Sequence, residues 1–413
     1  MSVQPSRNTY AALTVVSMAF AVLAGAAQSS RSGMPAQSGW LYVVDATNGA
    51  TSASILVVDP DTLQVTGSVP TGYRPDIALS RDGTRLYLAH SLPGPGQDTL
   101  REVVDIIDTT NGTIVHRIDS QNRWISTLPL YWSQIALSDD GRLLFQMKQQ
   151  IHDSSYTEYY IATLDLERNV FLPERAAIPM CFTGMMLPQP GHRLRLGVLC
   201  SRTEDLRLLT LSDTGAVLNA GRVPIAATGS QYRHAGTAFF APGGRQLTAV
   251  MSRGEFLRID AGAGQVIQRG LIDQTGRRPS DQSGASQSAA RPGAHDPNDW
   301  LVGRWMRTQP ALVSADHQRL VLGIGELEDK RRGHESYRMA AVFDTASLDR
   351  VDTIKLSQPA WGMTMSRDGR RLYTFGVGLG EASGTMSVVD VVAGREVTTV
   401  PLGTTPTYAV EAP

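Results

Sequence analysis

Short apolar runs with period-two alternation recur from residue 40 to the end of the chain, and turn residues separate them. The first three runs cover residues 40–44, 55–59 and 64–69. Each is rich in apolar, often β-branched residues and is bounded by Gly, Pro, Asp or Asn, which is typical of β-strands. Helical spacing is not sustained anywhere along the chain. The pattern therefore predicts an all-β protein.

An Asp-Gly turn between two such runs occurs more than once in the chain. The sequence Ser-x-Asp-Gly begins at Ser80 and again at Ser366, and a looser copy begins at Ser138. Asp-Gly between alternating apolar runs is a strong signal for a β-hairpin, because Gly tolerates a positive φ and Asp bonds its own backbone. A recurring hairpin predicts a repeat architecture.

A second marker, an acidic residue that closes an apolar strand, gives the repeat length. It recurs at Asp59, Asp108, Asp165, Asp213, Asp260, Asp344 and Asp390. Successive markers lie 46–57 residues apart, as four-stranded propeller blades require, except for one gap of 84. That gap leaves room for an eighth blade. However, residues from about 270 to 300 are rich in Gly, Ser, Gln and Arg and lack alternation, so we interpret them as an inserted loop.

These markers predict a seven-bladed β-propeller of four-stranded antiparallel blades over residues 40–413. The chain starts at what corresponds to the second strand of a blade. It ends with residues 405–411, which resemble residues 75–80 but have no hairpin after them. We therefore expect the N- and C-terminal strands to share one blade and to close the ring, which removes an exposed sheet edge.

The N-terminus has the features of an export signal over residues 1–27. Arg7 precedes an apolar stretch over residues 10–27, and small residues near its end offer a cleavage site. The alternative is a permanent anchor, but the stretch is short and rich in Ala. Residues 28–39 form a polar linker. The sequence predicts a cleaved signal, a periplasmic protein and no stable membrane anchor.

Composition narrows the chemistry further. The formal net charge of the 413 residues is −1, which does not favour nucleic acid or an anionic membrane surface as a partner. The eight histidines are scattered, and neither a metal-ligand spacing nor a nucleophile elbow is present. We predict no catalytic residue and no metal site on this chain.

The two cysteines, Cys181 and Cys200, each lie in an apolar, strand-like run. Neighbouring strands of one blade, joined through residues 187–195, would bring the two sulfur atoms close together. In an exported protein this favours a disulfide. Two buried free thiols are the alternative.

The whole pattern after residue 40 resembles the heavy chain of the tryptophan tryptophylquinone amine dehydrogenases, the methylamine and aromatic amine enzymes. Ile-Pro-Met-Cys-Phe at 178–182, followed by Val-Leu-Cys-Ser at 198–201, looks like the intra-blade disulfide of that family. Residues 101–108 followed by Leu-Pro-Leu-Tyr-Trp at 128–132 are a second likeness, and the charged loop before Met-Ala-Ala-Val-Phe-Asp, within 328–344, is a third. The single units also resemble Tyr-Val-Thr-Asn propeller repeats, which imply no particular function.

The resemblance implies a scaffold subunit of an amine dehydrogenase. In the family, the quinone forms from two tryptophans of a separate, cysteine-dense light chain, whereas this chain has six tryptophans and two cysteines. It would hold no cofactor itself, bind the light chain and wall the channel to the quinone. The assembled enzyme would oxidise a primary amine to an aldehyde and ammonia. Electrons would pass to a periplasmic cupredoxin or cytochrome c.

The resemblance also implies candidate residues for the substrate channel, and we add candidates for the partner interface. Gly72-Tyr73-Arg74-Pro75 corresponds to a Gly-Phe-x-Pro segment of the family, which makes Tyr73 the candidate for the substrate channel; packing between blades is the alternative. Candidates for the partner interface are Trp132, Trp300 and Trp305.

Two departures from the family leave a second function open. The acidic N-terminal extension of the family is short here, and residues 270–300 diverge. Either change is compatible with altered assembly or with loss of the light chain. The second function is therefore a non-catalytic periplasmic propeller that binds a ligand or a protein through loops at one face.

Overall fold

The computed structural model describes residues 39–46, 53–93, 100–123, 135–151, 157–179, 181, 184–200, 205–225, 235–251, 254–272, 301–302, 312–314, 316–325, 337–377 and 383–413. Residues 33–413 form one compact unit. The predicted signal at 1–27 and most of the predicted linker and inserted loop lie outside the described residues. Within the described residues, no helix is long and apolar enough to cross a membrane.

Seven antiparallel sheets, which we number as blades 1 to 7, make up the unit. Blade 1 contains β29 (Pro406–Glu411), β1 (Leu41–Asp45), β2 (Ala53–Val58) and β3 (Val65–Thr71). Blade 2 contains β4 (Tyr73–Leu79), β5 (Arg85–Pro93), β6 (Leu100–Asp108) and β7 (Thr113–Arg123). Blade 3 contains β8 (Ile135–Leu137), β9 (Leu143–Ile151), β10 (Thr157–Asp165) and β11 (Val170–Ala177). Blade 4 contains β12 (Gly184–Pro188), β13 (Arg195–Cys200), β14 (Asp205–Leu211) and β15 (Val217–Pro224).

The last three blades follow the same order. Blade 5 contains β16 (Ala235–Phe240), β17 (Gln246–Met251), β18 (Glu255–Asp260) and β19 (Gln265–Leu271). In blade 6 the inner strand is in two pieces, β20 (Leu301–Val302) and β21 (Leu312–Val313), which both pair with β22 (Arg319–Gly325); β23 (Tyr337–Asp344) and β24 (Arg350–Ala360) complete it. Blade 7 contains β25 (Gly362–Met365), β26 (Arg371–Val377), β27 (Gly384–Asp390) and β28 (Arg395–Pro401). The predicted seven-bladed propeller is confirmed.

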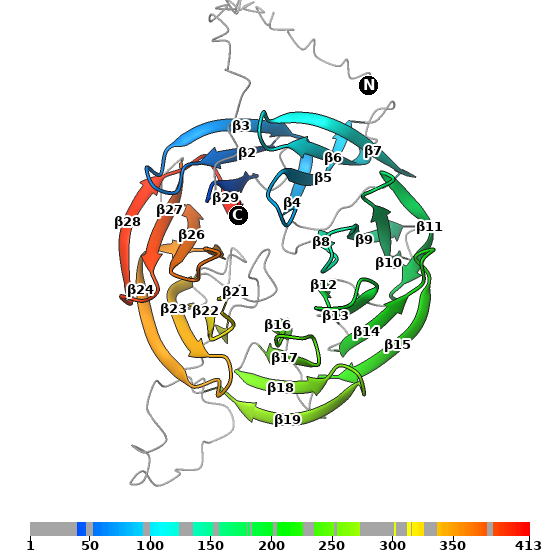
Figure 1. Ribbon diagram of the computed structural model, residues 1–413. Helices are drawn as coiled ribbons and strands as arrows, with labels where there is room; N and C mark the ends of the chain where they lie inside the picture. Colours follow the sequence, from blue (N-terminus) through cyan, green and yellow to red (C-terminus); the bar gives the residue numbers. More distant parts are fainter. Residues whose placement is uncertain are drawn as a thin grey trace, which may run out of the picture. The chain divides into compact units, whose positions relative to one another are not determined.

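The blades stand in a ring, with β3, β7, β11, β15, β19, β24 and β28 at its perimeter (Figure 1). The buried apolar side chains form seven clusters, and each cluster is shared by two neighbouring blades. Val43 of blade 1, for example, packs with Phe375 of blade 7, while Val57 of blade 1 packs with Leu88 of blade 2. Each sheet therefore buries both of its faces, which explains strands that are apolar at consecutive positions.

The ring closes inside blade 1, as predicted. Strand β29 pairs with β1, with Val43 opposite Ala409. The carboxylate of Asp45 accepts hydrogen bonds from the backbone N–H groups of Thr404 (3.0 Å) and Thr405 (2.5 Å). From blade 7, the hydroxyl oxygen of Thr364 accepts the N–H of Ala409 and donates to its carbonyl, both at 3.0 Å. The final strand is therefore held on both sides.

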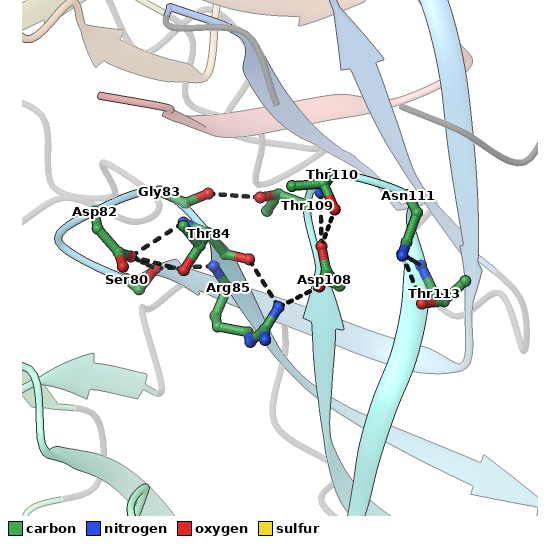
Figure 2. Close-up of polar contacts among 10 residues, drawn as sticks. All are labelled: Ser80, Asp82, Gly83, Thr84, Arg85, Asp108, Thr109, Thr110, Asn111 and Thr113. Atoms are coloured by element: carbon green, nitrogen blue, oxygen red, sulfur yellow. Dashed lines mark hydrogen bonds and ion pairs between the residues drawn. The ribbon is translucent and has the colours of Figure 1, made fainter. Parts of the chain in front are cut away.

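The Ser-x-Asp-Gly turns join the first and second strands of their blades. In blade 2 the Ser80 hydroxyl donates to Asp82 Oδ1 (2.6 Å), and the Arg85 backbone N–H donates to Ser80 Oγ (2.9 Å) (Figure 2). Gly83 has φ +72°, which only Gly adopts at low cost. Arg85 then reaches Asp108 of the next turn at 2.5 Å (Figure 2). Local hydrogen bonds therefore fix this face of the propeller.

The structure contains a fourth copy of this turn, in blade 6, that sequence reasoning missed. The Ser314 hydroxyl donates to Asp316 Oδ1 at 2.5 Å, and the Arg319 N–H donates to Ser314 Oγ at 2.9 Å. His317 occupies the position of Gly with φ +57°, so the Asp-Gly signal is absent. The spacing of Ser, Asp and Arg was the remaining signal.

One strand-closing marker was assigned to the wrong residue. Most of the predicted Asp markers accept the backbone N–H groups two or three residues later, as Asp390 does from Val392 (2.9 Å) and Ala393 (2.8 Å). In blade 4 this role belongs to Ser212, whose Oγ accepts the N–H groups of Thr214 (3.2 Å) and Ala216 (3.0 Å). Asp213 is one position too late, because β14 ends at Leu211.

The predicted disulfide between Cys181 and Cys200 is present. Cys200 is the last residue of β13, but Cys181 does not lie in a neighbouring strand of blade 4. It follows the end of β11 at Ala177, and its N–H donates to the carbonyl of Ile178 at 3.1 Å. Pro179 has no N–H for a further ladder bond, which helps to end the strand. The disulfide therefore ties the link between blades 3 and 4 to blade 4, and it indicates an oxidising compartment.

We predict that replacing both cysteines with Ser lowers the free energy of unfolding by about 3 kcal/mol, the value expected for closing a loop of this length. The measurement is urea unfolding of wild type and variant. Wild type under reducing conditions is the control and should shift similarly. An unchanged unfolding midpoint in the double variant would contradict a structural role for this disulfide.

Candidate functional site

The two faces of the propeller carry different connections. One face carries the turns between the first and second and between the third and fourth strands. The other carries the links from each outer strand to the next inner strand, and we call it the crossover face. One of its two shortest described links is between blades 1 and 2, where β3 ends at Thr71 and β4 begins at Tyr73. Only Gly72 separates the two strands.

Gly72 is enclosed on all sides. Its N–H donates to Nδ1 of the buried His90 at 2.7 Å. A Cβ atom at this position would lie 2.0 Å from the carbonyl oxygen of Ser91, so any other residue would clash with backbone. The residue before Tyr73 is therefore fixed by one hydrogen bond and by steric exclusion.

His90 belongs to a buried chain of charged and polar groups. Its Nε2 lies 3.0 Å from Oδ2 of Asp105, and Asp105 receives Nε and Nη2 of Arg117 at 2.7 Å each. Since Nδ1 accepts the Gly72 N–H, Nε2 carries the proton and the ring is neutral. Both ring nitrogens of His90 and both carboxylate oxygens of Asp105 therefore make hydrogen bonds. These groups suit the role of holding the backbone at Gly72 in place.

The electrostatics of Asp105 follow from this chain. Burial raises the pKa of Asp105, but hydrogen bonds from Arg117 and His90 outweigh burial and hold the pKa below its ordinary value. The hydrogen bond to Asp105 in turn raises the pKa of Arg117. Asp105 is therefore an ionised, fully buried carboxylate at neutral pH.

Tyr73 itself is half-buried and stands where the backbone is irregular. Arg74 has φ +53°, an uncommon value for a residue other than Gly, and the register of β4 and β5 shifts between Tyr73 and Asp76. The guanidinium carbon of Arg74 lies 4.8 Å from the centroid of the Tyr73 ring. Burial lowers the pKa of Arg74. The aromatic ring is thus held by a bulge and by a stacked cation.

Asp76 ties this strand to both neighbouring blades. Its Oδ2 accepts the N–H of Ile135 at the start of β8 (2.9 Å), and its Oδ1 accepts the hydroxyl of Tyr408 from β29. Tyr408 also accepts the N–H of Ile77 at 2.8 Å. Burial, and then the charge of Asp76, raise the pKa of Tyr408 well above its ordinary value. One buried carboxylate therefore joins the inner strands of blades 1, 2 and 3.

The sequence-based candidates have different outcomes. Tyr73 lies on the crossover face at the head of an inner strand, and its role in a channel remains a prediction. Trp132, Trp300 and Trp305 lie outside the described residues. Among the described residues, no group of three His, Cys, Asp or Glu side chains could hold a metal ion.

Sequence reasoning missed three residues of this site, His90, Asp105 and Arg117. The available signal was an acidic residue inside the apolar run of β6, because an unpaired charge is too costly to bury there. His90 and Arg117 come from the strands on either side of β6, so the partners could not be identified without the strand register.

We predict that D105N lowers the free energy of unfolding by about 2 kcal/mol at pH 7, because it weakens hydrogen bonds to a charged group. The folded-state pKa of Asp105 lies below its unfolded value of about 4, so this stabilisation is complete above that pH and is lost as the pH falls through the folded-state pKa. Urea unfolding at several pH values measures the difference between wild type and variant. D61N, at an exposed carboxylate, is the control. A difference that does not change with pH would contradict this assignment.

Comparison with protein-family profiles gives no match for this chain, and comparison with curated protein sequences gives none either. Among solved structures, the periplasmic gluconolactonase PpgL of Pseudomonas aeruginosa is 14% identical, covers 91% of this chain and 99% of its own, and has a TM-score of 0.61. The dihydro-heme d1 dehydrogenase NirN, in complex with DHE, is 16% identical over 90% of this chain and 75% of its own, with a TM-score of 0.51. The β-propeller domain of Cps50 (Swd1) from Myceliophteria thermophila is 11% identical over 81% of this chain and 89% of its own, with a TM-score of 0.53. At these identities the likeness shows the fold alone: the chain is a seven-bladed propeller similar to those of lactonases and NirN, and no activity follows from it.

Proposed function

We propose that this chain is the heavy, non-catalytic subunit of a periplasmic quinone-dependent amine dehydrogenase. The tryptophan tryptophylquinone would reside on a separate light chain and would supply the oxidation of a primary amine to an aldehyde and ammonia. A cupredoxin or cytochrome c would accept the electrons. The residues of this chain would position the partner and wall the substrate channel.

The observation that carries the proposal is the way Tyr73 is held. A half-buried aromatic ring on the crossover face is fixed by Gly72, which is in turn bonded to His90 at 2.7 Å. The ionisable groups behind it bond to one another, so they fix the backbone rather than stand ready for proton transfer. This arrangement suits a channel wall, for which precise placement matters more than reactivity.

Two further features support a scaffold for an exported assembly. The disulfide joins the link between blades 3 and 4 to the crossover end of β13, and it favours an oxidising compartment. Asp76 couples three inner strands near Tyr73, so the crossover face has a rigid base. Rigid elements place a binding surface more precisely than loops do.

The test is purification of the tagged full-length chain from its own host cell. We expect a small, cysteine-rich second polypeptide to co-purify, and a visible quinone absorbance that a primary amine bleaches. A chain that purifies alone and oxidises no amine supports instead the non-catalytic binding propeller. Amine oxidation by this polypeptide in isolation would overturn the scaffold assignment.

In the assembled enzyme we predict that Y73A changes the ratio of kcat/KM between a bulky aromatic amine and methylamine by about tenfold, the effect expected for losing one apolar contact. Y73F is the matched control, because it keeps the ring and removes only the hydroxyl. Steady-state dye reduction with each amine measures the ratio. If Y73A and wild type discriminate equally, Tyr73 only packs between blades.

A further inference from the structure

A pocket with a volume of about 840 Å³ opens between blades 2 and 3, and Tyr73 is not among its lining residues. We call it the lateral pocket. Side chains from β7, β9, β10 and β11 line it, among them Ile118, Lys148, Tyr160, Phe171, Leu172 and Arg175. Its size is in the range of small-molecule sites, and its walls combine apolar and aromatic side chains with charged ones.

Lys148 is the unusual member of this wall. The chain has 38 lysines and arginines together, but only Lys148, Lys330 and Lys355 are lysines. Lys355 is exposed on β24, whereas the Lys148 side chain is 2% exposed. The surface of this protein therefore uses arginine almost exclusively, and a lysine stands in a buried position. Burial lowers the pKa of a lysine ammonium much more readily than that of an arginine guanidinium.

The surroundings of Lys148 are those of a reactive amine. Its Nζ lies 3.2 Å from Oε2 of Glu102 in blade 2 and 4.9 Å from the centroid of the Phe171 ring. Among the described residues, no acceptor is aligned for a hydrogen bond with Nζ. Burial lowers the pKa of Lys148, with Glu102 acting in the opposite direction. Desolvation is the usual way in which a lysine becomes a nucleophile.

The charges around the pocket select the kind of ligand. Each cation already has an acidic partner: Lys148 has Glu102 at 3.2 Å, and Arg175 has Glu158 at 3.3 Å. Glu174 adds a further carboxylate, which accepts the Thr214 hydroxyl. An anionic ligand would meet this carboxylate with no unpaired cation to offset it. A neutral ligand with an apolar body avoids this charge repulsion and does not have to bury an unpaired charge.

We propose that the lateral pocket binds a neutral aldehyde with an apolar chain or ring, and that Lys148 forms a Schiff base with its carbonyl carbon. The ammonium gives a proton to Glu102, and the amine nitrogen attacks the carbonyl carbon. The C–N bond forms as the C=O bond opens to a carbinolamine. Glu102 returns the proton to the leaving hydroxyl, water departs, and a C=N bond remains. No oxidant or reductant is consumed.

That the aldehyde is the product of amine oxidation rests on the proposed function; the Schiff base itself does not. The purified full-length chain alone is therefore the test material. It is incubated with benzaldehyde and sodium cyanoborohydride at neutral pH, and peptide mapping locates the benzyl group. A failure of amine oxidation leaves the result of this experiment unaffected.

We expect benzylation at Lys148 to be several-fold faster than at the exposed Lys355, because the pocket holds the aldehyde beside a desolvated amine. The rate should saturate with benzaldehyde and fall when benzyl alcohol, which cannot form an imine, competes. K148R should lose the adduct while keeping the charge opposite Glu102, and K355R should label Lys148 as wild type does. Circular dichroism checks that both variants fold.

Peptide mapping of the wild-type chain tests whether Lys148 forms the Schiff base even if K148R does not fold. Equal labelling at Lys355 or the N-terminus, labelling of Lys148 that does not saturate, or no adduct at all would overturn the proposal. Lys148 would then be a buried structural ion pair with Glu102.

Discussion

The pairing of β29 with β1 is the constraint on which the rest of the structure depends. Each of the seven apolar clusters lies between two blades, so blades 1 and 7 bury both of their faces only when the ring is complete. The cluster between blades 7 and 1 forms only when the two ends of the chain meet. In blade 1 no turn joins the inner strand to its neighbour, so backbone pairing and the bonds of Asp45 hold the ring shut. Closure also leaves no open sheet face at either end of the row.

The two faces of the ring are stabilised by different kinds of hydrogen bond, local on one face and long-range in sequence on the other. On the turn face, four Ser-x-Asp turns repeat the same short hydrogen bonds between residues two to five positions apart. Toward the crossover face, buried carboxylates connect residues that are distant in sequence, as Asp76 connects β4 with β8 and β29. The candidate site therefore depends on ring closure, because Tyr408 reaches Asp76 from the final strand. Tyr73 lies three residues before this junction.

The sequence predicted the elements that local chemistry determines. Asp-Gly turns and strand-closing acids gave the number of blades, because these residues act on their own backbone within a few positions. The prediction failed where another residue takes the same role, as His317 does for Gly and Ser212 does for an acid. It also placed Cys181 in a strand, although the chain leaves β11 before reaching it.

The buried networks could not be predicted in this way. His90, Asp105 and Arg117 come from three strands of blade 2, and Lys148 meets Glu102 across an interface between blades. Only the register and the packing of the blades show which of the many charged residues are partners. The position of Tyr73 came from a family resemblance, and the geometry around it came only from the structure.

The most direct test of this account is the stability of a chain that ends at Thr405 and so lacks β29. The intact chain should unfold in one cooperative urea transition with a strong near-ultraviolet circular dichroism signal. We predict that the shortened chain loses both the cooperative transition and that signal, because the interface of blades 7 and 1 and the Tyr408–Asp76 bond disappear together. A shortened chain that unfolds with the same midpoint and cooperativity would contradict closure by the last strand.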